Sequence, residues 1–116
     1  MKEYKFMISI IHILFIGPAL VYLGHTHQNI DTWLNYVLLL SGIAIASYHG
    51  YLVYKRGGIK PGFMYFLHAS IFAPLLIYTA IVGLMKKPVF WGVKKLLIMI
   101  GFASIGYHIL KITTTN

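Results

Sequence analysis

The sequence predicts an all-α integral membrane protein: a four-helix antiparallel bundle made of a duplicated transmembrane helical hairpin. Three observations predict this class, namely the composition, four long apolar runs, and two residue patterns that each occur twice. Of the 116 residues, 59% are hydrophobic and 10% are charged, whereas about a quarter of the residues in a soluble domain are charged. So few charged side chains cannot cover a water-facing surface, which excludes soluble globular, disordered and coiled-coil proteins.

Each apolar run is close to the roughly 20 residues with which a helix crosses the hydrocarbon core of a bilayer. We expect helices over about 7–24, 33–54, 63–84 and 94–112, within a single transmembrane domain over 1–116. Lipid offers the backbone no hydrogen-bond partners, so these runs must be helical despite their β-branched residues.

Each helix has identifiable ends. The first run carries no charged residue, and the second follows Asp31 or Thr32, either of which is a suitable N-cap, with Trp33 at the depth of the interface. The Gly and Pro residues of 55–62 end the second helix and begin the third. The basic turn 86–95, which contains a proline, precedes the fourth helix.

The short connections make sequential helices antiparallel neighbours and put both termini on one side of the membrane. Lysine and arginine residues are more numerous on the side of the termini, six against four: Lys2, Lys5, Lys55, Arg56, Lys60 and Lys111 against Lys86, Lys87, Lys94 and Lys95. The positive-inside rule therefore favours a multi-pass protein with cytoplasmic termini.

The formal net charge of +8 comes from basic residues that cluster beside the apolar runs. In that position they contact anionic headgroups, so we expect the lipid bilayer, and not nucleic acid, as the partner. A homo-oligomer is also compatible with the sequence. The absence of cysteine excludes disulfides and thiolate metal sites.

Two patterns indicate an internal repeat with units of about 1–56 and 57–116. The pattern H-x5-P-x-L-x-Y occurs twice at an offset of 56 residues, and G-x-A-x3-Y-H occurs twice at an offset of 59. The first comprises His12, Pro18, Leu20 and Tyr22, then His68, Pro74, Leu76 and Tyr78; the second comprises Gly42, Ala44, Tyr48 and His49, then Gly101, Ala103, Tyr107 and His108. Two copies of equal orientation imply a pseudo-two-fold axis along the membrane normal, with or without a site on it.

The repeat places four histidines in one predicted layer, roughly 6–8 Å inside the hydrocarbon edge. These are His12, His49, His68 and His108. Small residues share a helical stripe with two of them, Gly42 and Ala46 with His49, and Gly101 and Ser104 with His108. Such stripes face protein and not lipid.

Tyrosines and prolines are the predicted supporting residues of this layer. We expect Tyr48 and Tyr107 near the histidines, and Pro18 and Pro74 to kink their helices. Each kink would free a carbonyl, near Leu14 in one helix and near Ser70 in the other, and an imidazole or a tyrosine hydroxyl would be its partner. Tyr22 and Tyr78, the tyrosines of the same pattern, are the other supporting residues.

A four-histidine layer is compatible with several chemistries. Two facing imidazoles can ligate a b-type haem, with Lys55, Arg56 or Lys60 near its propionates, and three or four can bind a divalent metal. Histidines and tyrosines can also relay protons. The alternative is a structural or scaffold protein, cellular or virion, in which the histidines only make interhelical hydrogen bonds. No carboxylate lies within any apolar run, which argues against an enzyme that uses carboxylate acid–base chemistry.

Overall fold

The computed structural model describes residues 2–26 and 30–114, and throughout these residues the regular secondary structure is helical. The elements are α1 (Glu3–Ile11), η1 (His12–Ile16), α2 (Gly17–His25), α3 (Thr32–Arg56), α4 (Phe63–Leu67), η2 (His68–Phe72), α5 (Ala73–Leu84) and α6 (Trp91–Thr114). The segments α1, η1 and α2 form one continuous helix, as do α4, η2 and α5. The predicted all-α class is therefore confirmed.

Four helices of the described chain are long and apolar enough to cross a membrane: Glu3–His25, Thr32–Arg56, Phe63–Leu84 and Trp91–Thr114. They contain 23, 25, 22 and 24 residues, each enough to span about 30 Å of hydrocarbon. The first and fourth helices begin three or four residues earlier than predicted, because the polar and aromatic residues that precede the apolar runs continue the helical turns. A small membrane protein with four candidate spans accounts for these features.

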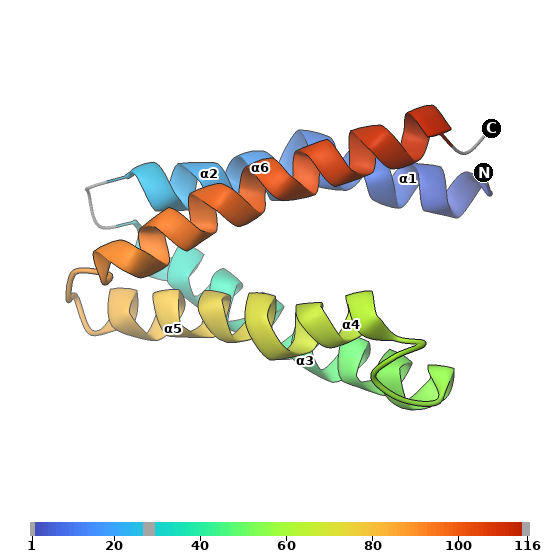
Figure 1. Cartoon of the computed structure of the whole chain (residues 1–116). Helices are drawn as coiled ribbons and strands as arrows, with labels where there is room; N and C mark the ends of the chain where they lie inside the picture. Colours follow the sequence, from blue (N-terminus) through green and yellow to red (C-terminus); the bar gives the residue numbers. More distant parts are fainter. Residues whose placement is uncertain (1, 27–29, 115–116) are drawn as a thin grey trace. The chain divides into compact units, whose positions relative to one another are not determined.

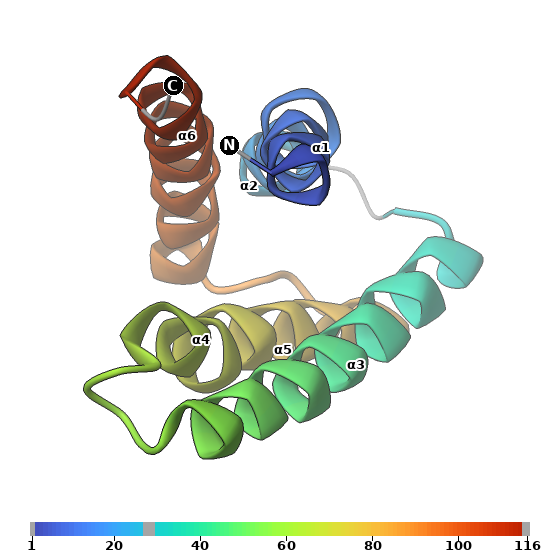
Figure 2. The same ribbon diagram turned by 90° about the vertical axis from the view of Figure 1, so that its right-hand side faces the viewer.

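The chain divides into two compact units of two helices each. Unit 1 contains the α1–η1–α2 helix and α6, and unit 2 contains α3 and the α4–η2–α5 helix. Within each unit the two helices lie side by side (Figures 1 and 2). Each unit therefore takes one helix from each predicted repeat copy, and the single domain and the repeat boundaries stay predictions.

The two helices of each unit run antiparallel. In unit 1, Gly17 lies against Gly101, whereas Gly24, further along its helix, lies against the backbone of the earlier residue Lys94. In unit 2, Asn35 lies against Gly83, whereas Gly42, further along its helix, lies against the earlier residue Ala73.

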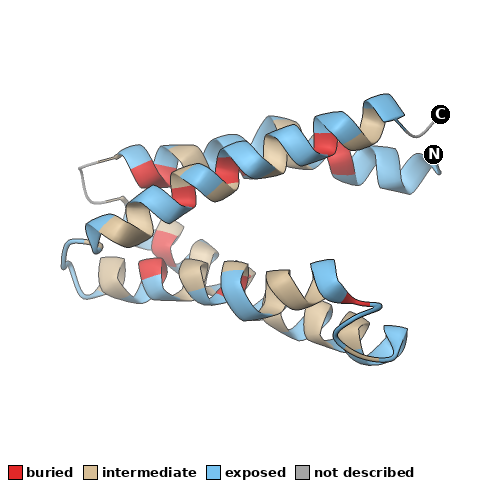
Figure 3. Ribbon diagram, viewed as in Figure 1, coloured by how far each residue is buried: buried red, intermediate tan, exposed pale blue. Residues whose placement is uncertain are grey.

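Few side chains are buried within the described residues (Figure 3). Leu97 and Ala73, at 1% and 0% exposure, lie at helix contacts, whereas Phe15 and Leu40 are each 66% exposed. Large apolar side chains that point outward from helices of this length fit a lipid environment, where they need no burial inside the protein.

The residues predicted to begin and end α3 do so, with one difference in the hydrogen bonds at its start. Asp31 directly precedes the helix, as predicted, but its carboxylate accepts a hydrogen bond from the Trp33 indole at 3.3 Å and makes no capping bond. At the other end, Gly57 has a φ of +95° and its N–H donates to the Tyr54 carbonyl, while the Gly58 N–H donates to the Val53 carbonyl. This pair of bonds is a Schellman motif, which glycine permits at positive φ.

Candidate functional site: two stacked histidine pairs

A π-helical turn follows each of the two histidines of the first pattern. The Gly17 N–H donates to the His12 carbonyl, and the Ala73 N–H donates to the His68 carbonyl, five residues back in both helices. A proline, which has no N–H, comes directly after each of these turns. The sequence located the disturbance correctly, because Leu14 and Ser70 lie inside the π-helical segments. Its form, a widened turn, was not expected.

In unit 1, His12 and His108 stack face to face across the two helices. Their ring centroids are 4.2 Å apart and their planes differ by 26°. The His12 Nδ1–H donates to the Ile8 carbonyl at 2.7 Å. The His108 Nδ1 lies 3.0 Å from the Ser9 hydroxyl, in a contact that joins α1 and α6. His108 is 9% exposed and Ser9 is fully buried, whereas His12 is half-buried, so the contact between His108 and Ser9 is the enclosed part of this site.

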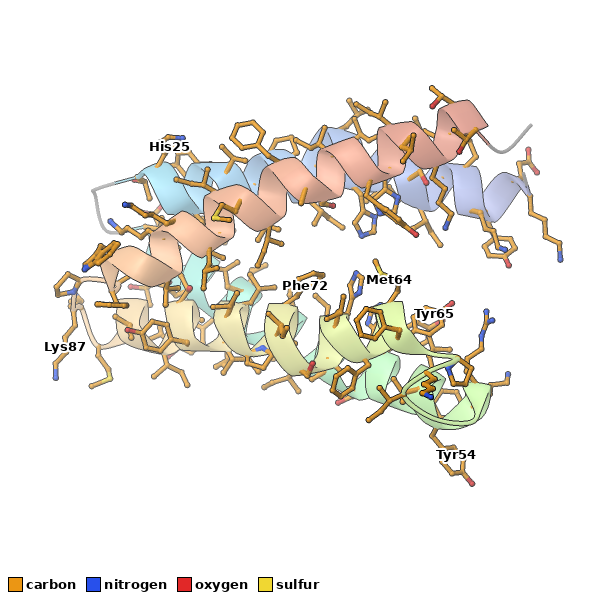
Figure 4. The ribbon with its side chains drawn as sticks, in the orientation of Figure 1. His25, Tyr54, Met64, Tyr65, Phe72 and Lys87 are labelled. Carbon is orange, nitrogen blue, oxygen red and sulfur yellow. The ribbon has the colours of Figure 1, made fainter. Side chains whose placement is uncertain are left out.

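In unit 2, His49 and His68 form the corresponding pair. Their centroids are 4.7 Å apart and their planes are nearly parallel, at 9°. The Tyr65 ring lies 5.9 Å from His49, and the Phe72 ring meets His68 edge-on at 4.8 Å. Tyr65 and Phe72 come from the α4–η2–α5 helix (Figure 4). Both rings of this pair are half-buried.

Hydrogen bonds fix the orientation of three of the four rings. His49 and His68 each donate Nδ1–H to the carbonyl four residues earlier, at 3.0 Å and 2.6 Å, as His12 does. A neutral imidazole that carries its proton on Nδ1 has its lone pair on Nε2. The backbone therefore sets Nε2 as the basic atom in these three histidines.

The supporting tyrosines fall into two groups. Tyr48 and Tyr107 each meet the neighbouring histidine ring edge-on, at 5.5 Å and 5.1 Å, and are largely exposed. Tyr22 and Tyr78 follow the histidine of their own helix by ten residues, about 15 Å of helical rise. At that distance their hydroxyls do not reach the histidine pairs.

Besides Phe72, whose ring contacts His68, two further residues that contact the pairs were missed from the sequence. Ser9 precedes His12 by three residues and contacts His108, and Tyr65 precedes His68 by three residues and contacts His49. Residues three apart lie on the same face of a helix, and this spacing was the available signal.

The predicted glycines lie at the helix contacts and make equivalent contacts in both units. A Cβ added to Gly101 would lie 2.7 Å from the Gly17 carbonyl oxygen and 2.7 Å from the side chain of Val21. A Cβ added to Gly42 would lie 3.2 Å from the Ala73 carbonyl oxygen and 2.6 Å from the side chain of Ile77. These contact residues are related by the two sequence offsets of 56 and 59.

The stacked geometry limits the chemistry of each pair. Axial haem ligands point ring nitrogens at the iron from opposite sides of the porphyrin, and rings in face-to-face contact leave no room for it. A haem held by both histidines of one pair does not fit. Among residues 2–26 and 30–114, no three histidine or acidic residues are grouped as a metal site requires. Comparisons with family models, with curated proteins and with solved structures gave no match.

Proposed function

We propose that this protein binds protons within the membrane at its two stacked histidine pairs. The observation that carries the proposal is that both units bring two histidines from different helices into ring contact. Histidine is the side chain whose charge ordinarily changes near physiological pH. The only acidic residues of the chain, Glu3 and Asp31, lie outside the apolar runs, which leaves the histidines as the titrating groups there.

The stacking supports uptake of one proton by each pair. Two unit charges about 4 Å apart repel by about 4 kcal/mol at an effective dielectric constant of 20, which corresponds to roughly a thousandfold weaker binding of a second proton. A charged ring on a neutral one avoids this repulsion. The two rings therefore titrate as a unit and not as independent groups, and Nε2 receives the proton wherever Nδ1–H is bonded to the backbone.

Proton counting tests the proposal. Between about pH 8 and pH 5, potentiometric titration of the protein in detergent should show that the double variant His12→Asn/His108→Asn binds about one proton fewer than the wild type. The variant His49→Asn/His68→Asn should give the same difference. His25→Asn, which alters one exposed histidine outside the pairs, is the reference variant. A loss of two protons per pair, or of none, would refute the proposal.

The second candidate is a structural protein in which the pairs hold the helices together. The contact between the Ser9 hydroxyl and His108 favours it, because it joins two helices 99 residues apart in sequence. Such bonds within membranes contribute about 0.6 kcal/mol each. Under this alternative, the asparagine variants unfold more easily but bind as many protons as the wild type. Under proton binding, the proton count falls whether or not stability changes.

We also propose that the chain arose by duplication of a transmembrane hairpin and has both termini on the cytoplasmic side. The repeated glycine contacts, π-helical turns and histidine stacks support the duplication. The start of α1 and the end of α6 lie at the same end of unit 1, which supports termini on one side. Cysteines introduced beside Lys5, Arg56 and Lys111 should be labelled from one side of the membrane, and one beside Lys87 from the other. Equal labelling from both sides would contradict this topology.

A further inference from the structure

Three basic residues lie close together where α3 ends in unit 2. Lys55 and Arg56 are the last residues of α3, and Lys60 follows in the loop before α4. We call residues 55–62, which carry these three cations, the basic loop. The only carboxylate side chain of unit 2, Asp31, precedes α3 at its other end, about 37 Å away along 25 helical residues. The charge of the basic loop is therefore not neutralised by an acidic side chain of its own unit.

The backbone makes this loop compact. The Schellman motif at Gly57 and Gly58 closes α3, and the Gly62 N–H donates to the Gly58 carbonyl at 3.1 Å. Gly62 is buried, and a Cβ there would lie 3.2 Å from the Cα of Val53. The loop therefore folds back onto the end of α3 and holds its cations at that end of the unit.

A tyrosine positions the guanidinium of the basic loop. The Arg56 Nη2 donates to the Tyr65 hydroxyl at 3.3 Å, and its guanidinium carbon lies 5.4 Å from the centre of the Tyr65 ring. Elsewhere in the described chain, Lys94 donates to the Thr26 carbonyl and Lys95 lies over the Trp91 ring. A guanidinium with a fixed orientation suits phosphate, to which arginine can donate two parallel hydrogen bonds.

Exposed apolar and aromatic side chains surround the same end of unit 2. Tyr54 is 83% exposed and points away from the helices (Figure 4), and Ile59 and Phe63 are each 53% exposed. Aromatic residues beside cations, where a candidate span ends, are typical of the headgroup region of a bilayer. These neighbours favour a lipid phosphate over a phosphate in solution.

From these observations we infer that the basic loop binds the phosphate of an anionic phospholipid headgroup. Arg56 forms the oriented contact, Tyr65 is the residue that positions it, and Lys55 and Lys60 supply further charge. The basic loop contains neither histidine of the proton-binding proposal, and Tyr65 is the residue that contacts both His49 and Arg56.

Lipid binding to the full-length protein in detergent micelles tests the inference, with phosphatidylglycerol, phosphatidylcholine and inorganic phosphate as probes and native mass spectrometry as the readout. We expect phosphatidylglycerol to bind more tightly than phosphatidylcholine. Each cation near an anionic lipid contributes about fivefold, so Lys55→Gln/Lys60→Gln should weaken phosphatidylglycerol binding about 25-fold, and Arg56→Gln at least about fivefold. Tyr65→Phe should weaken it about twofold, through the loss of one exposed hydrogen bond.

The matched control removes the same charge at the other end of unit 2. Lys86→Gln/Lys87→Gln should change phosphatidylglycerol binding by less than about twofold, because charges so far from the basic loop are screened from a lipid bound there. Fluorescence of Trp33, the tryptophan of unit 2, verifies that each variant is folded. Equal losses in the two double variants, equal binding of the two lipids, or equally tight binding of inorganic phosphate would each overturn the inference.

Discussion

Units 1 and 2 place the same two patterns in contact but pack them differently. Unit 1 has Gly17 where unit 2 has Ala73, and the space above Gly17 is filled by Ile105, whose counterpart in unit 2 is the small residue Ala46. At this contact unit 1 therefore combines a glycine with a large side chain, whereas unit 2 has an alanine on each helix. The π-helical turn and the stacked histidines are therefore common to both units, while the residues that fill the helix contact differ.

The polar surroundings of the two histidine pairs differ as well. Ser9 closes the unit 1 pair with a buried contact, whereas its counterpart Tyr65 extends the unit 2 pair toward Arg56. At the far end of each unit, Lys94 donates to a backbone carbonyl, and its counterpart Asn35 is packed on Gly83 at 2% exposure. Within the described residues, the Asn35 Oδ1 has no hydrogen-bond partner.

The largest expected effect comes from filling a close backbone contact of unit 1. Gly101→Leu should lower the free energy of unfolding of unit 1 by about 3 kcal/mol, because its Cβ meets the Gly17 carbonyl, which cannot move aside. Trp91 is the tryptophan of unit 1, so its fluorescence in a Trp33→Phe background, followed during detergent denaturation, measures this change. Gly106→Leu, on the same helix with open space around it, is the control. Similar effects of the two substitutions would contradict the close approach.

An exchange of side chains tests whether the units are equivalent. Gly17→Ala alone should destabilise unit 1 by about 1–2 kcal/mol, since the new Cβ would lie 2.4 Å from Ile105. In combination with Ile105→Ala, which recreates the pairing of unit 2, the loss should be smaller than the sum of the single losses by about 1 kcal/mol. The same denaturation measurement applies. Gly17→Ala with Ile109→Ala, at an exposed neighbour, should be additive, and additivity in both double variants would refute the equivalence.

The partners of the histidine pairs should differ in their contribution to stability. Ser9→Ala should cost about 1 kcal/mol, because it removes a buried contact to His108. Tyr65→Phe should cost only a few tenths of a kcal/mol, because the hydrogen bond it removes is exposed. Trp91 fluorescence in a Trp33→Phe background and Trp33 fluorescence in a Trp91→Phe background report the two units separately. A larger loss for Tyr65→Phe would reverse the proposed order.

Another small effect concerns the helix ends. Gly57 ends α3 at positive φ without strain, whereas Lys86 ends α5 with a φ of +56°. An L-residue other than glycine is disfavoured in this conformation, so Lys86→Gly should stabilise unit 2 by about 0.5 kcal/mol, measured by Trp33 fluorescence during denaturation. Lys86→Gln removes the charge but keeps the strain and should have no such effect. Equal stabilisation by both would assign the gain to charge.

The existence and approximate ends of the helices could be predicted because the bilayer allows few alternatives to a helix for an apolar run of about 20 residues. The prolines located the disturbed turns, since Pro18 and Pro74 lack the N–H that a regular helix needs there. Neither the π-helical form nor the partner of each helix could be predicted. Hydrophobic periodicity shows which face is buried, but it does not distinguish His12 beside His108 from His12 beside another histidine.

The sequence predicted a single layer of four histidines, whereas the structure shows two stacked pairs, one in each unit. Gly42 and Gly101 correctly indicated the protein-facing side of their helices. The stacking depends on side-chain rotamers that the backbone carbonyls select, as in the bond from His12 to Ile8, and a residue pattern does not contain this information. Whether the two pairs share one depth in the membrane stays a prediction.

Histidine-labelled protein in lipid bilayers offers the most direct test of the paired site, through solid-state ¹⁵N NMR of the imidazole rings. We predict ring-to-ring correlations within His12–His108 and within His49–His68, whose centroids lie 4.2 Å and 4.7 Å apart. As the pH falls, one ring of each pair should become charged while its partner stays neutral. Rings without these correlations, or two rings of a pair that become charged together, would contradict the account.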